Sequence, residues 1–156
     1  MISPEEYRAV MRNLVSGVTV VTTTADGRRY GMTATSFTSV SLDPMLVQVC
    51  LQKSSRTHGA MRRSRRLGIS ILAAGQEEVA RRFSSHATDA FEGCEIVPGD
   101  TGLPLISGAI GHLEGRVVQE FEGGDHTIFL AEVEAGRAAN GPPLIHFQGG
   151  YRAMGD

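Results

Sequence analysis

The sequence lacks the cysteine content and the long apolar segments that mark several large classes of protein. Its 156 residues include no tryptophan and only two cysteines, Cys50 and Cys94, which do not form a CxxC pair. Two isolated cysteines are too few for a disulfide framework. No apolar run approaches the roughly 20 residues that span a bilayer, so we expect no membrane segment. The basic and then apolar layout of a signal peptide is absent as well, and we expect a cytoplasmic protein.

Positive charge is not in excess. The 15 lysine and arginine residues are balanced by 17 aspartate and glutamate residues, which gives a formal net charge of −2. The densest basic cluster consists of Arg62, Arg63, Arg65 and Arg66, and no aromatic residues alternate with it to stack on bases. We therefore expect no nucleic-acid partner. The cluster fits a solvated helix face, although a dinucleotide phosphate would also be attracted to it.

The motifs of the commonest nucleotide-binding and nucleophilic sites are missing. The sequence contains neither GxGxxG after a strand nor GxxxxGKS/T, so it gives no support for a Rossmann or P-loop phosphate site. GxSxG is absent, and Cys50 lies in an apolar segment, where a thiol is usually inert. Four histidines share no metal-ligand spacing, and we expect no metal site. They are His58, His86, His112 and His146.

Glycine and β-branched residues are abundant. Nineteen glycines indicate many tight turns or close backbone approaches. Short segments rich in valine, isoleucine, threonine and leucine are separated by turn residues, which is the pattern of antiparallel strands. We expect strands at residues 18–24, 29–37, 39–42, 46–51, 67–72, 110–121, 126–136 and 144–147. Segment 46–51 is expected to be covered on both faces, residues 84–108 to form a loop, and a short tail to follow Gly149 and Gly150.

Helical patterns occur between these strands. Ser3, Pro4 and Glu6 form a capping-box start, and apolar residues at helical spacing continue to Leu14, so a helix is expected to end near Gly17. Two further helices are expected at residues 57–66 and 76–83. Strands with scattered helices favour an antiparallel barrel over a regular parallel sheet. We therefore predict a single domain, residues 1–156, that is all-β with helical additions.

Three polar segments are candidate sites. Thr33, Ala34, Thr35 and Ser36 place small side chains at the end of a strand, where they would line a flat aromatic ligand or simply form the exposed face of the strand. Residues 53–57 lead into a helix and offer cations, hydroxyls and the helix N-terminus to an anion, or else form an ordinary helix cap. His126 follows a Gly-Gly-Asp turn, where it would exchange a proton near neutral pH or face solvent as a bystander.

Six short motifs are distributed along nearly the whole chain. They are SGVTVVTT at 16–23, DG at 26–27, GMTATSF at 31–37, SVSLDP at 39–44, GDH at 124–126 and PL at 143–144. Together they resemble the short-chain flavin reductase family, the reductase components of two-component flavin monooxygenases. The resemblance implies a split antiparallel β-barrel that binds flavin. It also implies an NAD(P)H:flavin oxidoreductase that reduces FMN or FAD with NADH or NADPH and supplies reduced flavin to a partner monooxygenase.

The same resemblance implies roles for individual residues. The flavin would be contacted by Thr33, Ala34, Thr35, Ser36, Cys50, Leu51, Gln52, Ser54, Ser55, Thr57, Phe83 and Tyr151, with Ser54, Ser55 and Thr57 at the phosphate. His126 would act beside the nicotinamide and flavin rings, and the protein would be a homodimer with each site near the subunit interface. Two alternatives stay open because one fold hosts several functions. They are a non-catalytic flavin-binding module and a split-barrel oxidase with tightly bound flavin.

Overall fold

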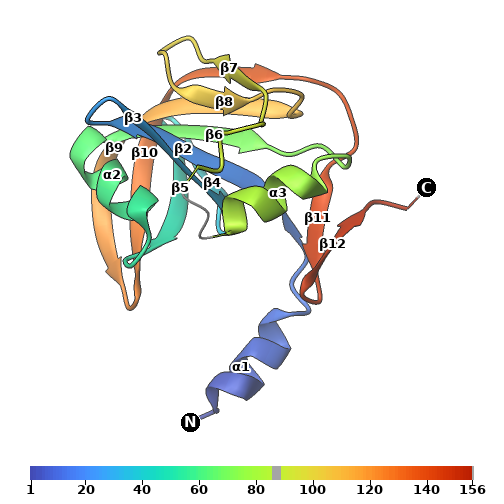
Figure 1. The fold of residues 1–156 in the computed structure, drawn as a ribbon. Helices are drawn as coiled ribbons and strands as arrows, with labels where there is room; N and C mark the ends of the chain where they lie inside the picture. Colours follow the sequence, from blue (N-terminus) through green and yellow to red (C-terminus); the bar gives the residue numbers. More distant parts are fainter. Residues whose placement is uncertain (86–88, 156) are drawn as a thin grey trace.

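The computed structural model describes residues 1–85 and 89–155 and is built mainly of antiparallel strands (Figure 1). His86 lies outside the described residues. The helices are α1 (Pro4–Met11), α2 (Arg56–Ser64) and α3 (Glu77–Ser84). The strands are β1 (Ser16–Gly17), β2 (Thr19–Ala25), β3 (Arg28–Ala34), β4 (Thr38–Leu42), β5 (Met45–Gln52), β6 (Arg66–Ile71), β7 (Ile96–Pro98), β8 (Pro104–Ile106), β9 (Gly111–Gly123), β10 (His126–Ala138), β11 (Leu144–Phe147) and β12 (Gly150–Ala153). Within the described ranges, no helix is long and apolar enough to cross a bilayer.

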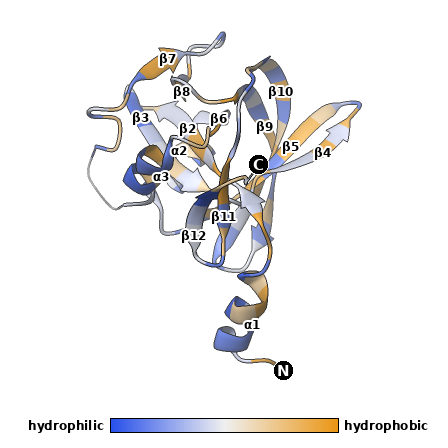
Figure 2. Cartoon of the chain, turned by 90° about the vertical axis from the view of Figure 1, so that its right-hand side faces the viewer, coloured by the Kyte–Doolittle hydropathy of each residue, from blue (hydrophilic) through white to orange (hydrophobic). Residues whose placement is uncertain are grey.

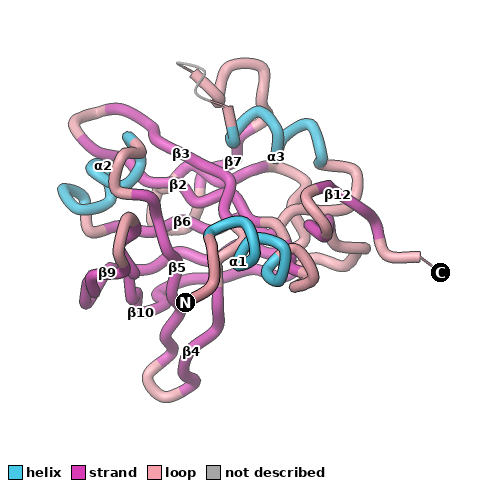
Figure 3. Tube along the Cα trace, turned by 90° about the horizontal axis from the view of Figure 1, so that it is seen from below, coloured by secondary structure: helices cyan, strands magenta, loops and turns pink. Residues whose placement is uncertain are grey.

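Seven strands form the main sheet in the order β3-β2-β6-β9-β10-β5-β4, and each neighbouring pair is antiparallel. The strands β3 and β4 are its two edges, so the sheet curls around a core without closing (Figure 1). Viewed from below, the β4–β5 hairpin projects from one side of the molecule (Figure 3). The predicted all-β class with helical additions is confirmed, and the open, rolled sheet is that of a split barrel.

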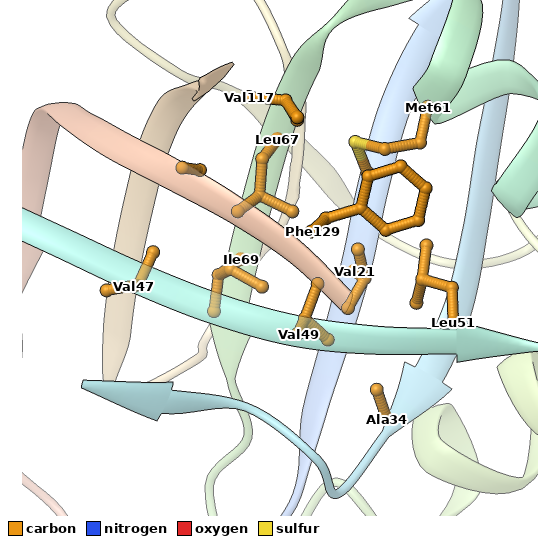
Figure 4. Packing of buried hydrophobic residues seen from close by; sticks show 11 residues of the cluster. Val21, Ala34, Val47, Val49, Leu51, Met61, Leu67, Ile69, Val117 and Phe129 are labelled. Carbon is orange, nitrogen blue, oxygen red and sulfur yellow. The ribbon is translucent and has the colours of Figure 1, made fainter. Parts of the chain in front are cut away.

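A hydrophobic core fills the inside of the rolled sheet. Phe129 of β10 is fully buried, and Met61 of α2 and Leu51 of β5 lie close to its ring (Figure 4). Burial of a side chain of this size contributes about 1.5–3 kcal/mol. Met61 therefore anchors α2 to the sheet and fixes where the first turn of that helix lies.

A second hydrophobic cluster holds α3 in place. β2 lies between the two clusters, with Val21 in the first and Val20 in the second. Ala80 and Phe83 of α3 belong to the second cluster. The polar residues of β2 are compatible with burial because they are hydrogen-bonded; Thr19 Oγ1, for example, donates to a backbone carbonyl of β3 at 2.7 Å. Both helices are thus held by burial against the same few strands.

The first helix is shorter than predicted. Its capping box is present, since Ser3 N–H donates to the Glu6 carboxylate at 2.7 Å and Glu6 N–H donates to Ser3 Oγ at 3.2 Å. The helix nevertheless ends at Met11 rather than near Gly17. No residue of α1 is buried, so no packing stabilises a further turn. Asn13 instead donates its side-chain amide to a carbonyl of the last turn at 3.0 Å.

Two segments predicted to lack strands form hairpins. Within residues 84–108, β7 pairs with β8, and Pro98 and Pro104 leave strands of three residues that are too short to show a period. The tail forms β12, which pairs with β11. Gln148 and Gly149 between them adopt positive φ angles of 51° and 78°, which suit a tight hairpin turn.

The prediction that residues 46–51 are covered on both faces is wrong. The alternate residues Val47, Val49 and Leu51 are buried, whereas the side chains between them are only partly covered. β5 belongs to an antiparallel sheet that turns one face to the core, so its other face is left partly open.

Candidate functional site

A cleft of about 450 Å³ lies along the edge strand β3, between the start of α2 and the end of α3. It is lined by residues 28–33 of β3, by 52 and 54–57 around the β5–α2 connection, and by 83–85 and 89–91. Six of the predicted flavin-binding residues line it, and they are Thr33, Gln52, Ser54, Ser55, Thr57 and Phe83. The structure therefore brings together residues from four separate stretches of sequence.

The wall formed by β3 is closely packed because Gly31 admits two aromatic rings. A Cβ atom at Gly31 would lie 2.9 Å from Phe83 Cε1 and 3.1 Å from Phe91 Cζ. The two rings meet edge to face with their centroids 5.0 Å apart. Two residues further along the strand, Thr33 Oγ1 donates to the carbonyl of Ala80 in α3 at 2.6 Å. Because β3 is an edge strand, its outward N–H and C=O groups are available to hydrogen-bond a ligand.

The β5–α2 connection offers donors to an anion. Ser55 is the N-cap of α2, and its Oγ accepts from His58 N–H at 3.1 Å. Ser54, Arg56 and Thr57 line the cleft beside it. The first turn of a helix carries a partial positive charge and N–H groups without helical partners. This connection therefore combines hydroxyl groups, a guanidinium and a helix N-terminus, which together can bind a phosphate group.

The other ring-binding residues predicted on β3, on the loop after it and on β5 are not part of the cleft lining. Ser36 Oγ donates to the carbonyl of Cys50 at 2.9 Å and accepts from Cys50 N–H at 3.1 Å, which joins the loop after β3 to β5. Thr35 is exposed and Ala34 is buried. Leu51 is fully buried in the core, so a contact between Leu51 and a ligand has to come from its backbone.

His126 stands at the start of β10, directly opposite Gln52 of the cleft in the β5–β10 register. Its Nδ1–H donates to Asp125 Oδ1 at 2.7 Å, and this hydrogen bond lowers the pKa of the Asp125 carboxyl. Lys53 N–H donates to the carbonyl of Asp125 at 2.9 Å and ties the turn to the β5–α2 connection. The His126 side chain is 43% exposed, and its Nε2 is the nitrogen left for a ligand. Its ring lies beside the cleft rather than in the lining.

Tyr151 lies at the end of α3. Its hydroxyl is 3.3 Å from the Oγ of Ser84, a residue that lines the cleft. Arg81 lies over the tyrosine ring, with its Cζ 5.2 Å from the ring centroid. Tyr151 therefore borders the cleft through Ser84.

The basic cluster near the end of α2 is engaged with acidic side chains. The ion pairs are Arg62–Glu120, Arg63–Asp26, Arg65–Glu120 and Arg66–Glu134, with N–O distances of 2.9–3.3 Å. None of these four arginines lines the cleft described above. Of the two possibilities for this cluster, the structure favours the solvated, ion-paired face.

Several residues that line the cleft were not predicted from the sequence, notably Arg28, Arg29 and Phe91. The two arginines gave a weak signal, since adjacent cations directly follow the Asp-Gly turn. Phe91 gave none, because it lies in the segment that was expected to be an irregular loop.

The lining fits a flat ligand that carries phosphate. The nearly buried rings of Phe83 and Phe91 form an apolar part of the wall, the β3 edge provides hydrogen bonds in a plane, and the α2 start provides an anion site. Among residues 1–85 and 89–155, no cluster of three or more histidine, cysteine, aspartate or glutamate side chains is placed to hold a metal ion.

Comparisons with known proteins agree with this geometry. The model of the flavin reductase like domain matches residues 11–155. The NADH-dependent FAD reductase of Streptomyces globisporus is 45% identical over 133 residues, which cover 82% of this chain and 72% of that protein. The reductase component of a 4-nitrophenol 4-monooxygenase/4-nitrocatechol 2-monooxygenase from Rhodococcus opacus is 38% identical over 146 residues, covering 94% and 78%. The solved structure of the Streptomyces globisporus C-1027 NADH:FAD oxidoreductase SgcE6, in complex with NAD and FAD fragments, matches with a TM-score of 0.93 at 39% identity and covers 99% of this chain and 96% of that chain.

Proposed function

Since the chain belongs to the flavin reductase-like domain family, we propose that it is an NAD(P)H:flavin oxidoreductase that reduces FMN or FAD. The observation that carries the proposal is the cleft on β3. It combines a hydrogen-bonding edge for a planar ring with an anion site at the start of α2. The names of two relatives, an NADH-dependent FAD reductase and a monooxygenase reductase component, support the same activity.

The residues of the chain bind and orient the reactants. Bound flavin supplies the redox chemistry by accepting hydride from reduced nicotinamide. Ser54, Ser55 and Thr57, with the first turn of α2, hold the flavin phosphate. The edge of β3 orients the plane of the flavin ring. Two reactants held in one cleft in a fixed orientation react in an effectively unimolecular step. His126 offers Nε2 to the reacting rings, while Asp125 holds the opposite ring nitrogen.

The active form is a homodimer in this proposal. α1 is eight residues long and buries none of its side chains, and so short a helix is marginal in water on its own. Tyr7, Val10 and Leu14 are 56%, 66% and 59% exposed. Figure 2 shows apolar positions along α1, which extends away from the body of the protein. A second copy would cover this surface.

The proposed partner is a flavin-dependent monooxygenase that receives the reduced flavin. The Rhodococcus relative, which is named as the reductase component of such a system, supports this partner. We place the protein in the cytoplasm, where reduced nicotinamide is available. Its two cysteines, Cys50 and Cys94, are both free thiols, which suits a reducing compartment.

Oxidation of NADH and NADPH by the purified protein, with FMN, FAD and riboflavin added in turn, tests the activity. Turnover that saturates with added flavin is the expected result, and the same assay without flavin gives the background. Flavin binding without nicotinamide oxidation above that background would instead identify a non-catalytic flavin-binding module. A copurifying flavin that turns over only with another donor would identify an oxidase.

A further inference from the structure

The cleft carries more positive charge than one phosphate requires. Arg28 and Arg29 begin β3 and line the cleft, and both are exposed. No carboxylate in the described part of the chain lies within 4.0 Å of either guanidinium. Asp89 is the one carboxylate among the described lining residues, and its Oδ1 accepts from the backbone N–H of Phe91 at 3.0 Å. The four arginines near the end of α2, by contrast, are all ion-paired.

The two arginines reach the cleft from opposite faces of the edge strand, because alternate side chains of a strand point to opposite sides. Arg29 shares its face with Gly31, and its Cζ lies 4.8 Å from the centroid of the Phe91 ring. Arg28 shares the other face with Tyr30, which also lines the cleft. A group that enters this end of the cleft therefore meets a guanidinium on each side of β3.

This end of the cleft is separate from the predicted ring and phosphate positions. Arg29 precedes Thr33 by four residues on β3, which is about 13 Å of extended strand. The first anion site lies at Ser54, Ser55 and Thr57, on a different element. The arginines are thus placed for a second anionic group, beyond the ring and its first phosphate.

We propose that Arg28, Arg29 and Phe91 form a second anion subsite that takes the adenylate half of a dinucleotide. Two guanidiniums provide charge-assisted hydrogen bonds to a phosphate. Tyr30 is partly exposed and provides aromatic surface for a purine, while the buried Phe91 ring lies against the guanidinium of Arg29. The inference rests on the proposed function, and it assigns the protein a preference for dinucleotides over mononucleotides in this cleft.

Equilibrium binding of the variants Arg28→Gln and Arg29→Gln tests the subsite without depending on turnover. Dissociation constants are measured by fluorescence titration for the pair FAD and FMN and for the pair NADH and reduced nicotinamide mononucleotide. We expect the dissociation constant of a dinucleotide to rise roughly tenfold, because a charged hydrogen-bond donor is lost. The dissociation constant of the corresponding mononucleotide should stay within about twofold of the wild-type value. A rise for FAD alone identifies flavin as the ligand, and a rise for NADH alone identifies nicotinamide.

Arg137→Gln is the matched control, because Arg137 is an exposed arginine on β10 that is paired with Asp100 and does not line the cleft. It should bind all four nucleotides as the wild type does. Equal losses for FMN and FAD would overturn the subsite, since the arginines would then bind the first phosphate, and so would unchanged binding of both dinucleotides. If wild-type protein reduces no flavin, the proposed function fails, while the titrations still decide the subsite.

Discussion

At the level of single residues, the turn between β9 and β10 determines how His126 is presented. Its Nδ1–H donates to Asp125 Oδ1 at 2.7 Å, and an ionised carboxylate accepts only from a protonated nitrogen. The hydrogen bond from His126 lowers the pKa of Asp125, so this carboxylate stays charged at neutral pH. The proton of a neutral imidazole is therefore held on Nδ1, and Nε2 is left to accept.

Replacement of His126 by alanine is expected to impair reduction more than flavin binding. We expect kcat/KM for NADH to fall roughly tenfold to a hundredfold, as for loss of a positioned proton-transfer or hydrogen-bonding group. The dissociation constant for flavin should stay within about twofold. Anaerobic stopped-flow kinetics and flavin titration measure the two quantities.

Asp125→Asn serves as the companion variant, because it keeps a hydrogen-bond acceptor and removes the charge. Turnover of Asp125→Asn should lie between the turnover of the wild type and that of His126→Ala. Equal turnover of His126→Ala and wild type would remove the assigned role of this histidine.

At the level of elements, β3 connects the cleft to α3. One face of the strand bonds to the helix through Thr33 Oγ1, which donates to the carbonyl of Ala80 at 2.6 Å. The same face admits Phe83 because Gly31 has no side chain. The position of α3 and the shape of the cleft are therefore coupled through a short stretch of one edge strand.

Gly31→Ala is expected to disturb both stability and ligand binding. The new methyl group would lie 2.9 Å from Phe83 Cε1, so the ring has to move. Overpacking of this kind costs about 1–3 kcal/mol of unfolding free energy. Denaturant unfolding and flavin titration should show lower stability and weaker binding.

Gly75→Ala is the control for this substitution, because no atom lies within 4 Å of a Cβ built at Gly75. It should leave the unfolding midpoint and flavin affinity near the wild-type values. Wild-type stability and affinity in Gly31→Ala would show that Phe83 is not fixed by its contact with β3.

For the whole molecule, apolar surface is concentrated in two projecting parts. One is α1, and the other is the end of the β4–β5 hairpin, where Leu42 and Met45 are 86% and 54% exposed. Figure 2 shows both parts extending from the body of the protein, and Figure 3 shows the projecting hairpin from below. Exposed apolar side chains gathered on a projecting element are typical of interaction sites.

The double substitution Val10→Glu and Leu14→Glu is expected to convert the proposed dimer to a monomer, since it places two charges on the exposed apolar surface of α1 and of the turn that follows it. Sedimentation velocity measures the change. Arg8→Gln is the control on the same helix, because the Arg8 side chain is 68% exposed and pairs only with its helical neighbour Glu5 in the described structure. A double variant that still sediments as a dimer would show that α1 is not the interface.

Most strands could be predicted from the sequence, since their signals are local. Threonine and valine between residues 18 and 24 favour extended backbone, and the Asp-Gly turn at 26–27 starts the hairpin to β3. The capping box fixed the start of α1. The end of α1 and the β7–β8 and β11–β12 hairpins were missed, because they depend on packing or on strands too short to show a period.

The cleft itself was partly foreseen, since the segments 31–37 and 53–57 carried its signals, and Thr33 and Ser55 do line it. Local chemistry was enough there, because hydroxyls at a strand end and at a helix cap are read from adjacent residues. Which charged groups face the cleft followed from long-range pairing instead. The arginines near the end of α2 meet Glu120 and Glu134 across the sheet, while Arg28 and Arg29 meet no carboxylate in the described residues. Residues adjacent in sequence predict neither outcome. The partner of a surface charge depends on which strands lie beside each other in the sheet, and only the tertiary structure determines that arrangement.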